Sequence, residues 1–89
     1  MEKNEQGNNE KFPEIAPGQF ALLQCEFTTG IVLNREGKYL TRHKDESYIV
    51  FDSFSDTLEF INNRQFKNIE YWIYDFKGEL KHEKSVPPD

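Results

Sequence analysis

The sequence contains one cysteine, two histidines and five scattered glycines in 89 residues. A single cysteine, Cys25, excludes an internal disulfide framework, and with two histidines it cannot build a structural zinc site of the usual Cys/His type. The glycines do not gather into a loop that could cradle a phosphate. We therefore expect no metal and no cofactor, and the lone cysteine favours a cytoplasmic protein.

Long apolar runs are also missing, since hydrophobic residues make up 36% of the chain. No stretch approaches the roughly 20 residues that a membrane-spanning helix needs, and residues 1–11 lack the apolar centre of a secretory signal. Basic residues are outnumbered, 11 against 16 acids, which gives a formal charge of −5. Binding to nucleic acid depends on cations that neutralise phosphate. We expect neither a membrane nor a nucleic acid among the partners.

Catalytic combinations are scarce. Cys25 and His43 could form a nucleophile and a base, but Cys25 falls within an apolar segment, where a cysteine is normally an inert small hydrophobic residue. The acids Asp52, Asp56 and Glu59 surround the expected start of a helix, where the helix dipole favours negative charge without a catalytic role. We therefore expect that the protein is not an enzyme.

Aromatic residues are the abundant class, at 15% of the chain. They fall in short segments of strand length that are rich in β-branched and aromatic residues. The expected strands cover residues 20–27, 31–33, 38–42, 47–51, 69–76 and 79–82.

One segment has helical spacing instead. Ser53 is a good N-cap, and it is followed by three apolar residues at helical intervals, namely Phe54, Leu58 and Ile61. The helix is expected to end at Arg64 or Gln65. The sequence predicts an α+β fold, with a small, mostly antiparallel sheet of four to six strands and a single helix packed on one face, in the order β-β-β-β-α-β(-β). Residues 1–18 are predicted as a disordered or extended tail, 19–84 as a single α+β domain and 85–89 as a C-terminal tail.

The strand expected at residues 69–76 is apolar on both faces. One row is Ile69, Tyr71 and Ile73, and the other is Trp72, Tyr74 and Phe76. A sheet with one solvated face should alternate apolar with polar residues, and one helix covers only one face. The second face has three possible covers: the N-terminal tail through Phe12 and Ile15, strong curvature of the sheet, or another chain.

Exposed aromatic patches mark interaction sites, and Trp, Tyr and Phe are enriched in the cores of interfaces. We therefore expect a non-enzymatic protein–protein interaction or homodimerisation module that uses an aromatic sheet face. The candidate interaction residues are Trp72, Tyr74, Phe76 and Phe60. The alternative is that these rings simply fill a small curved core.

Residues 34–44 hold four basic residues against one acid inside an acidic chain. One interpretation is a hairpin tip whose charges face water and protect a sheet edge. The other is a charged contact, for which the candidates are Arg35, Lys38 and Arg42. Two further functions fit the composition: an acidic inhibitor or immunity-type protein that neutralises a basic partner, and a small-molecule sensor domain.

Overall fold

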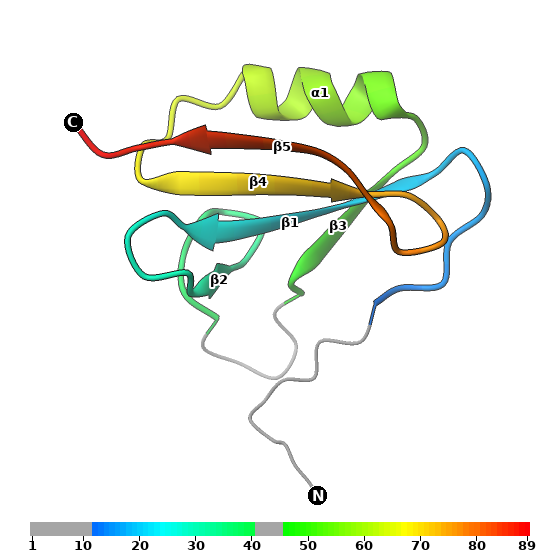
Figure 1. The fold of residues 1–89 in the computed structure, drawn as a ribbon, viewed down its shortest axis with the longest axis horizontal. Coiled ribbons are helices and arrows are strands. Elements are labelled where there is room, and N and C mark those ends of the chain that lie inside the picture. The colour runs from blue at the N-terminus through cyan, green and yellow to red at the C-terminus, as the bar shows by residue number, and fades with distance from the viewer. Residues whose placement is uncertain (1–11, 41–45) are drawn as a thin grey trace, which may run out of the picture.

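The computed structural model describes residues 12–40 and 46–89, which form an antiparallel sheet of five strands with a single helix (Figure 1). The elements are β1 (Phe20–Glu26), β2 (Val32–Leu33), β3 (Tyr48–Phe51), α1 (Phe54–Asn62), β4 (Ile69–Tyr74) and β5 (Leu80–Val86). The order β-β-β-α-β-β confirms the predicted α+β class with one helix. In these residues, no helix is long and apolar enough to cross a membrane.

Strand β1 lies at the centre of the sheet. One of its edges pairs with β4, and the other pairs with β3 over its first half and with β2 near its end. Strand β5 follows beyond β4. In Figure 1, α1 lies along one side of the sheet, above β5, and the N-terminal segment (blue) descends away from it. One face of the sheet is therefore left without a helix.

Helix α1 begins as the sequence predicts. The Ser53 hydroxyl accepts a hydrogen bond from the backbone N–H of Asp56 at 3.0 Å, which satisfies one of the unpaired donors of the first turn. The helix ends at Asn62 with Asn63 as its C-cap, two or three residues earlier than expected. The reason is local, because asparagine hydrogen-bonds to nearby backbone and so disfavours a helix interior.

The core lies between α1 and the sheet. Its buried members come from four strands and the helix: Leu22, Leu33, Ile49, Ile61, Ile69, Tyr71 and Ile73. Two polar residues are fully buried among them. The Thr57 hydroxyl donates to the Ser53 carbonyl at 2.9 Å, and the Gln24 side-chain amide donates to the Asn34 carbonyl at 2.8 Å. These bonds reduce the desolvation cost of burying both side chains.

Three of the expected strands differ from the observed ones by more than one residue. The return strand at 38–42 is reduced to an isolated bridge between Leu33 and Tyr39, and residues 41 and 42 lie outside the described residues. Strand β4 ends at Tyr74 because Asp75 starts a turn that its own carboxylate closes. Strand β5 is longer than expected, since it continues to Val86 opposite Ile69.

Candidate protein-binding face

The face of the sheet opposite α1, called the open face below, carries apolar side chains in cross-strand rows. Alternate residues of a strand point to opposite faces, so the neighbours of the core residues lie here. One row runs Val50, Ala21, Tyr74 and Leu80 from β3 to β5. The next row runs Tyr48, Leu23, Trp72 and Glu83. Apart from Glu83 at the β5 edge, both rows are apolar or aromatic, as the two-sided pattern of the sequence indicates.

The N-terminal segment covers part of the open face. The Phe12 ring centroid lies 5.3 Å from that of Tyr48 and 6.0 Å from that of Tyr74, with interplanar angles of 75° and 82°. Tyr48 and Tyr74 also meet edge to face at 6.4 Å. Ala21 lies in the Tyr74 row and is completely buried. Of the three expected covers for the second face, the structure therefore shows the N-terminal tail, which covers it with the ring of Phe12.

Removing the Phe12 ring should destabilise the fold. Each edge-to-face aromatic pair contributes about 0.5–1.5 kcal/mol beyond area burial, so Phe12→Ala should lower the free energy of unfolding by about 1–3 kcal/mol. Urea denaturation followed by circular dichroism measures this change. The control is Phe76→Ala, which removes an exposed ring and should leave stability within about 0.5 kcal/mol. Equal stability of the two variants would contradict the packing described for Phe12.

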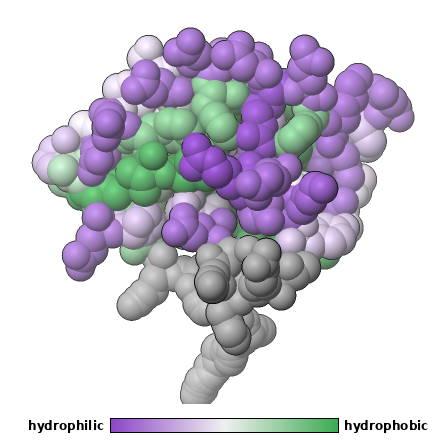
Figure 2. All heavy atoms as spheres, turned by 180° about the vertical axis from the view of Figure 1, so that it is seen from behind, coloured by the Kyte–Doolittle hydropathy of each residue, from purple (hydrophilic) through white to green (hydrophobic). Residues whose placement is uncertain are grey.

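The cover is incomplete. Val50 is 42% exposed and Leu80 is 44% exposed at the two ends of the Tyr74 row. Trp72 is half-buried, and its indole N–H is shielded without an acceptor within the described residues. An unpaired buried donor costs about 1–3 kcal/mol. Seen from behind, the molecule carries a band of apolar side chains bordered by polar ones (Figure 2).

The structure brings together two of the four predicted interaction residues. Trp72 and Tyr74 both lie on the open face. Phe76 follows the end of β4 and is exposed in the turn, with the Lys77 ammonium 5.8 Å from its ring centroid. Phe60 belongs to α1 and packs against Phe51, with ring centroids 5.1 Å apart on the helix side of the sheet. Phe60 and Phe76 are therefore separated from Trp72 and Tyr74 on the open face.

The additional members of the open face come from β1, β3 and β5. The sequence of residues 47–51 carried a signal for Tyr48 and Val50, because a strand of this composition has apolar side chains on both of its faces. Leu80 could not be found in this way. It is adjacent to Tyr74 because β4 and β5 change register between Ile73 and Tyr74. Such an irregularity leaves no periodic mark in the sequence.

Two of the three basic candidates, Arg35 and Lys38, lie outside the rows of the open face. Arg35 is in the turn after β2, and its carbonyl accepts a hydrogen bond from the Arg64 guanidinium at 2.9 Å. Its own guanidinium lies 5.9 Å from the Phe60 ring centroid. Lys38 is exposed in the same turn, and Arg42 lies outside the described residues. Arg35 is thus engaged with α1 and the residues that follow it.

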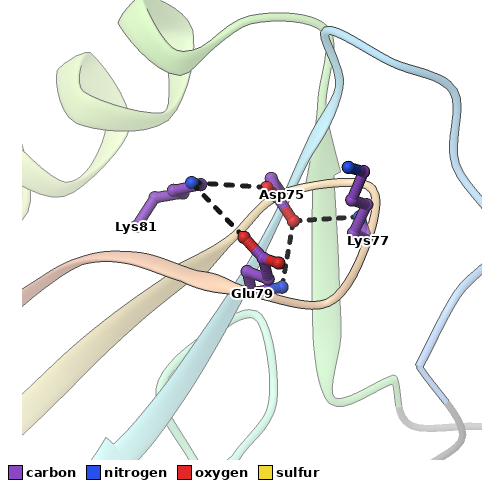
Figure 3. Close-up of polar contacts among 4 residues, drawn as sticks. All are labelled: Asp75, Lys77, Glu79 and Lys81. Atoms are coloured by element: carbon purple, nitrogen blue, oxygen red, sulfur yellow. Dashed lines mark hydrogen bonds and ion pairs between the residues drawn. The ribbon is translucent and has the colours of Figure 1, made fainter.

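The turn between β4 and β5 is organised by one carboxylate (Figure 3). The Asp75 carboxylate accepts hydrogen bonds from the backbone N–H groups of Lys77 and Glu79, each at 2.9 Å. The Lys81 ammonium lies 3.7 Å from the other oxygen of Asp75 and 3.6 Å from the Glu79 carboxylate. The pKa of Asp75 is lowered, and the largest cause is the hydrogen bond from the Glu79 backbone N–H. Burial acts in the opposite direction, while the hydrogen bond from Lys77 and the charge of Lys81 lower the pKa further.

This lowered pKa makes stability depend on pH in the acid range. The ionised form of Asp75 is favoured by folding, so its contribution is complete above the unfolded pKa of about 4 and is lost as the pH falls through the lower folded pKa. The Tm difference between wild type and Asp75→Asn should therefore be largest above about pH 4 and should close below it. Calorimetry between neutral and strongly acid pH measures the difference. A Tm difference that stays constant over that pH range would contradict the lowered pKa of Asp75.

The catalytic pair considered from the sequence consists of Cys25 and His43. Cys25 is buried on the open face, and desolvation, with the nearby Glu70 charge, raises the pKa of its thiol. His43 lies outside the described residues. Within residues 12–40 and 46–89, no group of three His, Cys, Asp or Glu side chains could hold a metal ion.

Comparisons with models of protein families, with curated proteins and with solved structures find no protein similar to this chain. The open face must therefore be interpreted from its own geometry and chemistry.

Proposed function

We propose that this protein is a non-enzymatic, cytoplasmic module that binds protein through the open face, and that the partner is a second copy of the chain. The observation that supports this is the Tyr74 row, which ends at the exposed Val50 and Leu80 although Phe12 packs against Tyr74 and Tyr48. Contiguous apolar surface of this kind is unusual on a monomer that has no partner. A two-fold dimer uses the same patch on both subunits, so a single apolar face is sufficient to build it.

The charge of the chain predicts how such an association depends on salt. Two copies with a formal charge of −5 each repel one another at low ionic strength. Self-association should therefore strengthen as salt is added. An acidic inhibitor of a basic partner would show the opposite dependence, because salt screens the attraction between unlike charges.

A charged side chain at the edge of the open face should prevent association. Val50→Lys places an ammonium within the proposed interface, where burying it without a partner is unfavourable. The matched control is Ile31→Lys, because Ile31 is also β-branched and is 48% exposed in the loop between β1 and β2. Light scattering over a range of concentrations should give a dimer mass for wild type and for Ile31→Lys, and a monomer mass for Val50→Lys.

The control separates a specific interface from a general effect of charge. If both lysine variants become monomeric, the interface does not lie on the open face. If wild type is monomeric at every concentration and salt level, self-association itself is excluded.

A further inference from the structure

A second feature lies at one end of the sheet, where the turn after β2 meets the segment that joins α1 to β4. An open pocket of about 500 Å³ is present there. Its apolar lining includes the buried core residues Leu33 and Ile69. Two rings also line it, Tyr39 at 52% exposure and Phe66 at 42%. The volume lies within the range of small-molecule sites, which are concave and mostly apolar.

The Tyr39 ring is held in place by a hydrogen-bonded cluster. Its hydroxyl donates to the Glu26 carboxylate at 2.9 Å. That carboxylate also accepts hydrogen bonds from the Thr29 hydroxyl at 2.7 Å and from the Asn68 side-chain amide at 3.3 Å. The hydrogen bond to Glu26 raises the pKa of Tyr39, and the phenol is a donor at neutral pH. The tether therefore fixes the position of this ring in the pocket wall.

The Phe66 ring is held by different contacts. It rests against the turn at Gly37, where an added Cβ would lie 2.6 Å from a ring carbon. The Arg64 guanidinium stacks over the same ring at 4.4 Å from its centroid. The turn is itself closed by the Asn34 side chain, which accepts hydrogen bonds from two backbone N–H groups, those of Glu36 and Lys38. Both rings are thus positioned without a ligand, which is the preorganisation that binding sites require.

The rim of the pocket carries both signs of charge in equal number. Glu26 and Glu36 are the acids, and Lys38 and Lys67 are the bases. Lys67 pairs with the carboxylate of Asp89 at 2.6 Å. A rim with balanced charge does not select a strongly charged ligand, whereas two aromatic rings over an apolar floor favour another ring.

We propose that this pocket binds a planar, uncharged aromatic ring that contacts Tyr39 and Phe66 and covers Leu33 and Ile69. The ring could belong to a free small molecule or to the side chain of a peptide, since both present the same chemistry. The site lies apart from the Trp72 and Tyr74 rows, so it does not depend on the function proposed for the open face.

The test is a titration of the ¹⁵N-labelled protein with indole, followed by amide chemical shifts. Shifts are expected at Gly37, Lys38 and Asn68. Tyr39→Ala and Phe66→Leu should each weaken indole binding at least about tenfold, since each removes one aromatic wall. Phe76→Ala is the control, because it removes an exposed ring that does not line the pocket, and its affinity for indole should equal that of wild type.

A parallel titration with the tripeptide Gly-Trp-Gly distinguishes the two sources of the ring. Tighter binding of the tripeptide supports a peptide side chain, and tighter binding of indole supports a free small molecule. The proposal is overturned if neither probe shifts the pocket amides. It is also overturned if folded Tyr39→Ala and Phe66→Leu bind indole as well as Phe76→Ala does.

Discussion

Replacing Leu22 with alanine should lower the free energy of unfolding by about 2–5 kcal/mol, the usual cost of truncating a buried leucine. Leu22 is completely buried in the central strand β1, where it pairs with Ile49 of β3 and Ile73 of β4. The cavity left behind would lie between three strands and the helix. Small domains have only about 5–15 kcal/mol of stability, so this one change removes a large share of it.

Urea denaturation measures the effect, with Ile31→Ala as the matched control. Ile31 is 48% exposed in a loop, so its truncation should change stability by no more than about 0.5 kcal/mol. A cost below about 1 kcal/mol for Leu22→Ala would mean that the centre of the core does not lie between β1 and α1.

Replacing Trp72 with alanine should weaken self-association by about thirtyfold, or about 2 kcal/mol, which is the threshold of an interface hot spot. Trp72 lies between Leu23 and Glu83 in the second row of the open face and is only half-buried by its own chain. Its large ring is therefore available to a second copy. Sedimentation equilibrium gives the dissociation constant of the dimer.

Trp72→Phe is the control for this experiment. It keeps an aromatic ring in the row and removes the indole N–H that lacks an acceptor within the described residues, so association should stay within about threefold of wild type. Circular dichroism must show that both variants remain folded. Equal dissociation constants for Trp72→Ala and wild type would remove Trp72 from the interface.

Much of the fold could be predicted from local patterns. Ser53 and the apolar residues that follow it specified α1, because capping and helical periodicity act over a few residues. The alternation along β4 also placed Tyr71 and Trp72 on opposite faces of the sheet, since neighbouring side chains of a strand point to opposite faces. The length of β5 was missed because it depends on pairing with β4. The end of α1 was placed two or three residues too late because the asparagines at its end were given too little weight.

The candidate site was only partly predictable. The presence of a second apolar face followed from the residues of β4, and the tail with Phe12 was one of its three expected covers. Phe76 was placed on that face by extending the strand period beyond Tyr74, and the Asp75 turn interrupts that period. The pocket beside Tyr39 had no signal in the sequence, because its walls come from segments that only the folded sheet brings together.

The most direct test of self-association through the open face is an isotope-filtered NOE experiment on a mixed sample of labelled and unlabelled protein. The open-face interface predicts intermolecular NOEs among the side chains of Val50, Trp72, Tyr74 and Leu80. Intermolecular NOEs confined to other surfaces, such as the exposed ring of Phe66, would contradict it. So would their complete absence at concentrations where light scattering gives a dimer.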